Sequence, residues 1–139
     1  MDGLLLRLAA AAALSLLGLG AWVLLRRAAL KQAARAAEGI EGLGERKSAL
    51  LYFNSPLCAV CRAAQGPAVR RFQEAAGETV QVLEIDVTER PDLAERWGIL
   101  SLPTTVVLDR EHRPLAVNPG LATAETLLRQ AAVAQAAPA

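Results

Sequence analysis

Two cysteines separated by two residues constrain this 139-residue chain more than any other feature. Both cysteines of the protein lie in the stretch YFNSPLCAVCR, as Cys58 and Cys61. An apolar run ending in a proline-containing loop precedes them, and a helical pattern follows. A C-x-x-C pair between a strand and a helix is a typical arrangement for dithiol chemistry. Two cysteines are too few for the disulfide framework of a small secreted protein, but they suffice for one redox pair.

The N-terminal segment is strongly apolar. Leu8–Leu25 is a run of 18 residues that contains no charge and one polar residue, Ser15. As a helix it would be about 27 Å long, close to the hydrocarbon thickness of a bilayer. We therefore predict an N-terminal transmembrane helix within an anchor of residues 1–27, with residues 4–25 in the membrane. A cleaved signal peptide is the alternative, since small residues occur in the run, but Arg26-Arg27 directly after it is a poor cleavage context.

Charge is distributed unevenly along the chain. Basic residues follow the apolar run on its C-terminal side: Arg26, Arg27, Lys31 and Arg35. By the positive-inside rule the protein is a single-pass membrane protein whose C-terminal domain lies in the cytoplasm, with an extracytoplasmic domain as the alternative. Residues 28–47 are interpreted as a juxtamembrane helix and linker. The remaining residues carry more acidic than basic groups and few aromatics, which excludes the basic surface of a nucleic-acid-binding protein.

The patterns in residues 48–139 predict one α/β domain. Short β-branched or aromatic runs indicate four strands: Ala49–Phe53, Thr79–Val87, Thr104–Leu108 and Leu115–Asn118. Helical spacing and end signals indicate three helices: Cys58–Ala76, Pro91–Trp97 and one that Thr123 caps and that runs to about Ala134. Pro67 predicts a kink near Ala63 in the first of these helices. The order is β-α-β-α-β-β-α, with a parallel first pair and an antiparallel last pair in a mixed sheet.

This order resembles the thioredoxin family over about Ala49 to Ala134. The similarity is carried by the C-x-x-C after the first strand, by EIDVTERPDLAERWGILSLPTTVVLD, and by Pro103 before the third strand. The resemblance implies that Pro103 is a cis-proline beside the dithiol and that Gly120 is the glycine of the last strand-to-helix turn. It also implies a substrate-binding site at Leu57, Leu102 and Pro103, in which the backbone of Leu102 pairs with the main chain of a protein substrate.

The sequence departs from the thioredoxin pattern at several positions. Leu57 stands in place of the tryptophan, and Ala59-Val60 replace Gly-Pro between the cysteines. Tyr52 replaces the buried acidic residue six positions before the first cysteine, and the partner lysine falls at Val82. The first strand and helix of full thioredoxins have no counterpart, which leaves the second strand near a sheet edge. These departures imply a specialised member of the family.

The two cysteines have different expected roles. Cys58 stands at a helix N-terminus, where free N–H groups and the helix dipole favour a thiolate, so we expect it to be the nucleophile. Cys61, one turn further on, is expected to be more buried and to act as the resolving thiol. Ala59 and Val60 tune the reduction potential without adding charge, which favours a reducing or intermediate potential. The expected partners are a protein disulfide substrate and an electron-donor protein, with no cofactor beyond the Cys58–Cys61 disulfide.

Other interpretations of the motif remain open. The domain could be a redox-inactive binding module that assembles a membrane complex, or the cysteine pair could be structural. Zinc would need four ligands, and the lone histidine, His112, falls in a polar turn, so no metal site is predicted unless two protomers share one. Glu84 and Asp86 share one face of a strand, and we expect them to be structural, with no cleft beside them.

Overall fold

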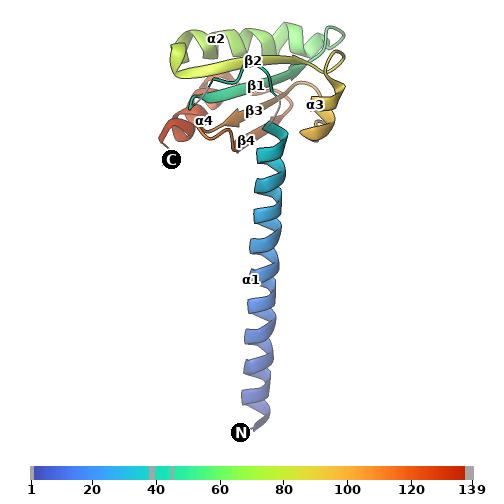
Figure 1. Ribbon diagram of the computed structural model, residues 1–139, viewed down its shortest axis with the longest axis vertical. Coiled ribbons are helices and arrows are strands. Elements are labelled where there is room, and N and C mark those ends of the chain that lie inside the picture. The colour runs from blue at the N-terminus through green and yellow to red at the C-terminus, as the bar shows by residue number, and fades with distance from the viewer. Residues whose placement is uncertain (1, 38–39, 45, 137–139) are drawn as a thin grey trace. The chain divides into compact units, whose positions relative to one another are not determined.

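Four strands form one mixed sheet in the order β2-β1-β3-β4 (Figure 1). The computed structural model describes residues 2–37, 40–44 and 46–136. The strands are β1 (Ser48–Asn54), β2 (Val80–Asp86), β3 (Thr104–Leu108) and β4 (Pro114–Pro119). The β1–β2 pair is parallel, whereas β3 pairs antiparallel with both β1 and β4. The predicted α/β order and the mixed sheet are confirmed, and the strand bounds differ from the predicted ones by a residue or so.

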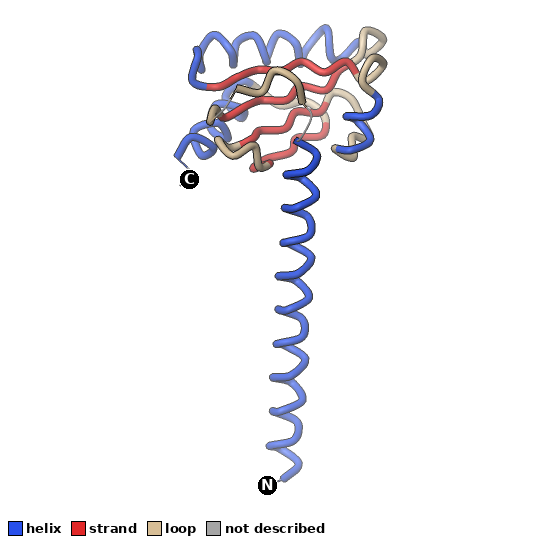
Figure 2. The backbone as a smooth tube through the Cα atoms, viewed as in Figure 1, coloured by secondary structure: helices blue, strands red, loops and turns tan. Residues whose placement is uncertain are grey.

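The central strand β1 is buried on both faces. Its sequence, SALLYFN, has six buried residues out of seven, as expected for a strand covered by helices on both sides. On one face, Leu50 and Tyr52 pack with α2 (Gly66–Ala76) and α4 (Ala124–Ala136). On the other face, alternate residues of β1 pack with Leu93 of α3 (Pro91–Arg96) and with Ile40. Figure 2 shows these strands flanked by helices.

The helix after the cysteines is interrupted where the sequence predicted a kink. The interruption is a π-helical turn, η1 (Cys61–Gln65), and regular α-helix begins at Gly66. Pro67 has no N–H, so the usual bond to the carbonyl four residues earlier is impossible. A single π turn inside a helix is one way to absorb that loss, and such turns are frequent at functional sites. Helix α2 ends at Gly77, whose φ of +59° suits glycine, and a short 3₁₀ turn, η2 (Gly77–Thr79), leads into β2.

The segment before β1 packs on the sheet where the sequence suggested a linker or a weak turn. Ile40 is 9% exposed and lies in the core under one face of the sheet. The backbone N–H of Gly44 donates to Gln81 Oε1 at 2.7 Å. His112, expected at the surface of its turn, is half-buried and places Nε2 3.3 Å from the Gly44 carbonyl oxygen. The rest of the predicted juxtamembrane segment includes residues 38, 39 and 45, which lie outside the described residues.

The chain divides into two compact units, Met1–Gln32 and Ala33–Ala139. Helix α1 (Asp2–Ala37) accounts for the first unit, and the described leucines of its middle part are exposed. Within the part of the chain that the structure describes, no helix is both long and apolar enough to cross a membrane. The membrane span over Leu8–Leu25 therefore stays a prediction.

Candidate active site around Cys58 and Cys61

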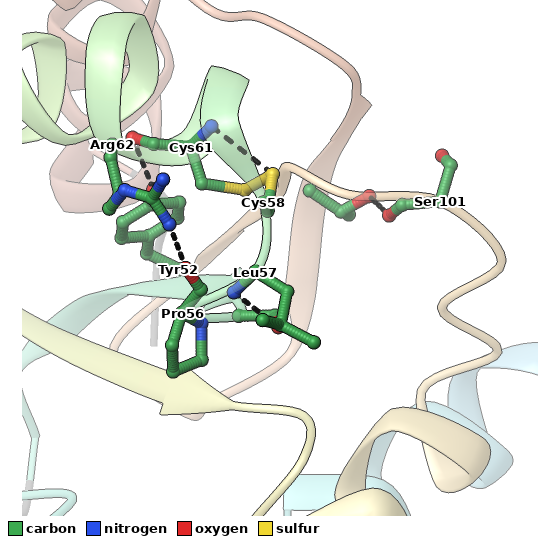
Figure 3. The surroundings of a disulfide bond; sticks show 9 residues. Tyr52, Pro56, Leu57, Cys58, Cys61, Arg62 and Ser101 are labelled. Atoms are coloured by element: carbon green, nitrogen blue, oxygen red, sulfur yellow. Dashed lines mark hydrogen bonds between the residues drawn. A yellow bond between two sulfur atoms is a disulfide. The ribbon is translucent and has the colours of Figure 1, made fainter.

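Cys58 and Cys61 form a disulfide just beyond the end of β1 (Figure 3). The sulfur–sulfur distance is 2.14 Å and the two Cα atoms are 5.2 Å apart. A turn at Ser55 brings the chain from the strand to the first cysteine. The Cys58 N–H donates to the Ser55 carbonyl at 3.0 Å, and the Leu57 N–H donates to Ser55 Oγ at 3.2 Å. The local sequence Asn-Ser-Pro thus ends the strand and orients the disulfide.

The two cysteines differ in exposure as their expected roles require. Cys58 is partly exposed, whereas Cys61 is only 2% exposed and belongs to the core beneath α2. The Cys61 N–H donates to Cys58 Sγ at 3.1 Å. That N–H would favour negative charge on Cys58 Sγ in the reduced protein, because a hydrogen bond to the charged form stabilises it. Ala59 and Val60 between them are exposed and uncharged.

The loop that precedes β3 carries the other predicted site residues. The Leu102–Pro103 peptide bond is cis, as the resemblance implied. Pro103 is buried, and its carbonyl accepts a hydrogen bond from Gly120 N–H at 2.8 Å, which ties the last turn before α4 to this loop. Leu102 is partly buried and packs against the same core cluster as Cys58. Figure 3 draws Ser101, from this loop, among the surroundings of the disulfide.

Exposed apolar side chains occur on the loops that carry these residues. Leu57 is 88% exposed and Leu100 is 98% exposed, and Leu121, next to Gly120, is exposed too. An apolar hollow of about 320 Å³ lies in the loop before β3, lined by Val87, Ala94, Ile99, Leu100, Ser101 and Leu102.

A second hollow, which Cys61 helps to line, was missed by the sequence analysis. It has a volume of about 270 Å³, and its lining includes Tyr52, Cys61, Arg70 and Glu84. The expectation that Glu84 has no cleft beside it is therefore wrong. The parallel register of β1 and β2 places Glu84 beside Tyr52. This register is set by long-range strand pairing, so residue spacing in the sequence could not have revealed the hollow.

Tyr52 lines this hollow and contacts Cys61, which lines the hollow as well. Its side chain is 3% exposed, and its hydroxyl donates to the Cys61 carbonyl oxygen at 3.0 Å (Figure 3). Burial raises the pKa of Tyr52, the nearby Glu84 carboxylate raises it further, and Arg70 opposes both effects. The phenol therefore stays protonated, and able to donate, through the neutral pH range. At the hollow's rim, the Arg62 guanidinium donates to the Pro56 carbonyl.

Comparison with known families and curated proteins places this chain among known redox proteins. Residues 25–132 match the family model described as TraF, F plasmid transfer operon protein. The thioredoxin of Alicyclobacillus acidocaldarius subsp. acidocaldarius is 33% identical over 86 residues, which is 62% of this chain and 80% of that protein. The thioredoxin of Bacillus subtilis is 30% identical over 56 residues, which is 40% of this chain and about half, 53%, of that protein.

Solved structures agree at the level of the fold. A structure described as thioredoxin-2, a component of malaria parasite protein secretion machinery, has a TM-score of 0.59 at 24% identity and covers 65% of this chain and 86% of its own. StoA from Bacillus subtilis has a TM-score of 0.53 at 16% identity and covers 63% and 84%. At such identities the likeness establishes the fold, while the activity follows from the sequence relatives and the C-x-x-C disulfide. The chain is a thiol–disulfide oxidoreductase that belongs to the thioredoxin-like proteins and to the family described as TraF, F plasmid transfer operon protein.

Proposed function

We propose that this oxidoreductase reduces disulfides of protein substrates while tethered to a membrane, and that a donor protein supplies its electrons. The observation that carries the proposal is the unequal exposure of the two cysteines, with Cys58 partly exposed and Cys61 2% exposed. The exposed sulfur can reach a disulfide in a second protein. The buried sulfur can reach only its neighbour, which is what a resolving thiol must do.

The reaction would consist of two thiol–disulfide exchanges. First, the Cys58 thiolate attacks one sulfur of the substrate disulfide, a mixed disulfide forms, and the other substrate sulfur leaves as a thiolate that takes a proton from water. Next, Cys61 loses its proton to water and attacks Cys58 Sγ. The Cys58–Cys61 disulfide forms, and the second substrate sulfur leaves and is protonated. Two electrons pass to the substrate, and the donor protein restores the dithiol by the reverse exchanges.

The reducing direction is supported by what surrounds Cys58 Sγ. A backbone N–H and a helix N-terminus favour the thiolate modestly, and Ala59 and Val60 add no charge to favour it further. A strongly stabilised thiolate would make the disulfide a strong oxidant. We therefore expect a potential closer to about −270 mV, typical of a reducing thioredoxin, than to about −120 mV, typical of a strong oxidant.

Substrate recognition would use the loops on either side of the disulfide. The backbone at Leu102, next to cis Pro103, can pair with an extended substrate segment, as in the addition of a short strand. The exposed Leu57 side chain adds apolar contact area beside Cys58. Together these features favour a substrate whose disulfide lies in an exposed, apolar stretch of chain.

Single cysteine substitutions test the function. We expect Cys58→Ser to lose reduction of a model protein disulfide, measured with insulin and dithiothreitol, down to the rate without protein. Cys61→Ser should accumulate a mixed disulfide, visible as a shifted band on a non-reducing gel. Ala63→Ser, which places the same hydroxyl at an exposed position of the next turn, is the control and should keep wild-type activity. Full activity of Cys58→Ser would refute the mechanism. If the wild type shows no turnover, the protein is a redox-inactive binding module instead.

The membrane tether is proposed from the apolar run Leu8–Leu25, and the cytoplasmic placement of the domain from the basic residues that follow it. A tether would confine the dithiol to substrates and donors at the membrane surface. In the cytoplasm the general reducing environment would keep the cysteines as a dithiol. An extracytoplasmic domain would instead require a dedicated donor across the membrane.

A further inference from the structure

The carbonyl group of Cys61 is held by two donors. One is the N–H of Gly66, which closes the π-helical turn Cys61–Gln65. The other is the Tyr52 hydroxyl on the central strand, at 3.0 Å (Figure 3). A carbonyl oxygen has two lone pairs, so both are used here. The approach is close: a Cβ atom at Gly66 would lie 3.2 Å from the Cys61 oxygen.

The π turn that carries Cys61 is a conformation that needs support. π turns are rare, and Cys61 could return to ordinary α-helical bonding by exchanging Gly66 N–H for Gln65 N–H. Such an exchange would rotate the residue and move its sulfur. In the disulfide form the covalent bond to Cys58 opposes that movement, whereas in the dithiol form it is gone. The Tyr52 hydroxyl is a second restraint that does not depend on the redox state.

We propose that Tyr52 is a positioning residue for the resolving step. Its hydroxyl holds the Cys61 turn in one conformation in the dithiol, the mixed disulfide and the disulfide, so that Cys61 Sγ stays directed at Cys58 Sγ. This role rests on the proposed resolving role of Cys61. Holding a thiol in place raises its effective concentration toward its partner, which makes both ring closure faster and the disulfide more stable.

The other contacts of Tyr52 are consistent with a positioning role and not with a role in proton transfer. The ring lies in the core with Leu50, Val69 and Phe72, which fixes its direction. Its raised pKa keeps the hydroxyl a donor, so it neither takes the Cys61 proton nor becomes charged at neutral pH. At the far end of the turn, Gln65 is fixed separately through its bonds to the Ala122 backbone. Tyr52 thus restrains the end of the turn that carries the sulfur.

The test compares Tyr52→Phe with a matched loss of a buried hydroxyl elsewhere on β1. Ser48 is 1% exposed and its hydroxyl donates to the Thr79 carbonyl at 3.4 Å, at the other end of the same strand. In the full chain, we expect Tyr52→Phe to lower the equilibrium constant for disulfide formation about fivefold, a potential ~20 mV less negative in a glutathione titration. The mixed disulfide with substrate should also live longer by a similar factor. Ser48→Ala should change neither quantity.

Equal potentials and equal mixed-disulfide lifetimes in wild type and Tyr52→Phe would overturn the proposal. The same outcome would leave the proposed function intact, because trapping by Cys61→Ser tests that independently. A measurement on the wild type covers the case in which Tyr52→Phe does not fold. Tyr52 is the sole tyrosine of the chain, so phenolate absorbance near 295 nm reports on it alone. Because burial and the Glu84 carboxylate raise that pKa, we expect it to be raised equally in the oxidised and reduced proteins, and a fall to about 10 on reduction would show that the ring leaves its buried place and would refute a support kept in both states.

Discussion

At the scale of single residues, the cysteines are surrounded by neutral hydrogen bonds, and one of the two sulfurs is buried. The contacts at the cysteines include Cys61 N–H to Cys58 Sγ and Tyr52 hydroxyl to Cys61 oxygen. The charged residues that line the hollow are Arg62, Arg70 and Glu84, and two of them, Arg70 and Glu84, act on the pKa of Tyr52. We therefore expect geometry to contribute to the reduction potential of this site, so that substitutions that preserve charge can still alter its chemistry.

Asp92 provides a pH-dependent contribution away from the dithiol. Hydrogen bonds from Arg90, at 3.1 and 3.0 Å, and then the charges of Arg90 and Arg96 hold the pKa of Asp92 down from 3.8 to about 2. Because the folded-state pKa is depressed, this contribution to stability is complete above the unfolded value of about 3.8 and is lost as the pH falls through about 2. We expect the Asp92 carboxyl carbon, followed by NMR, to titrate with a midpoint near 2.

Two variants control that titration. Asp92→Asn identifies the resonance, and Arg90→Gln should move the midpoint toward 3.8 because it removes the main donor. A wild-type midpoint near 3.8 would show that these exposed side chains do not keep their contacts in solution. The dithiol should be unaffected in both variants.

At the scale of elements, the π turn is joined to the loop before α4 by one side chain. Gln65 is fully buried, donates through Nε2 to the Ala122 oxygen at 3.1 Å, and accepts through Oε1 from the Ala122 N–H at 2.8 Å. The amide thereby pairs with a backbone group as a neighbouring strand would. Because Gly120 bonds to Pro103 in the same region, Gln65 links the cysteine turn indirectly to the cis-proline loop.

Replacing Gln65 should therefore destabilise the domain. Gln65→Leu keeps the approximate volume but leaves the N–H and C=O of Ala122 buried without partners, at a cost of about 1–3 kcal/mol for an unsatisfied group. We expect the free energy of unfolding, measured by urea denaturation, to fall by roughly 2–4 kcal/mol. Gln73→Leu on the exposed side of α2 is the matched control and should change stability by less than about 0.5 kcal/mol. A similar small change in stability for both variants would contradict a stabilising role for the two Gln65–Ala122 hydrogen bonds.

The elements themselves were largely predictable, whereas the contacts between them were not. Strand β3 was predicted with its observed bounds, because TTVVL is a buried β-branched run between two breaks. Thr123 was correctly predicted to cap α4, and its hydroxyl accepts from Thr126 N–H at 3.2 Å. Pro67 predicted that the helix is distorted. The distortion is a π turn held by Tyr52 and Gln65, and these contacts depend on residues far away in the sequence. Local patterns carry no information about such pairings.

The same limit applies to the site. The C-x-x-C spacing and Leu102-Pro103 could be identified because they are local motifs, and they are found as a disulfide and a cis peptide bond. The role of Tyr52 could not, since a tyrosine in a buried apolar strand looks like an ordinary core residue. Only the placement of Cys61 above it turns its hydroxyl into part of the site.

At the scale of the whole molecule, the proposed tether makes the N-terminal segment separable from the redox domain. We expect the full chain to stay in the membrane fraction through salt and alkaline carbonate washes and to be released by detergent. A chain without residues 1–32, the first compact unit, should appear in the soluble fraction. As a control of matched length, Leu14→Lys with Leu17→Lys should weaken retention, because charges at the centre of a bilayer are costly.

The side of the membrane can be determined with the same protein. A membrane-impermeant thiol reagent should fail to label Cys58 in intact, reduced cells if the domain is cytoplasmic, and should label it after lysis. Strong labelling of intact cells would place the domain outside. Recovery of the full chain in the soluble fraction, or its removal by carbonate, would contradict the tether itself.

The position of β1 at the centre of the sheet also governs how the protein can be made. β1 comes first among the strands, yet its core partners include Leu127 and Ala131 of α4, the last helix described. The ribosome therefore synthesises Cys58 and Cys61 about 70 residues before the part of α4 that completes the core around Cys61. At about 5–20 residues per second this interval lasts roughly 4–14 s. During that interval the core that buries Cys61 is incomplete, so we expect the Cys61 thiol to be more accessible in the nascent chain than in the folded protein.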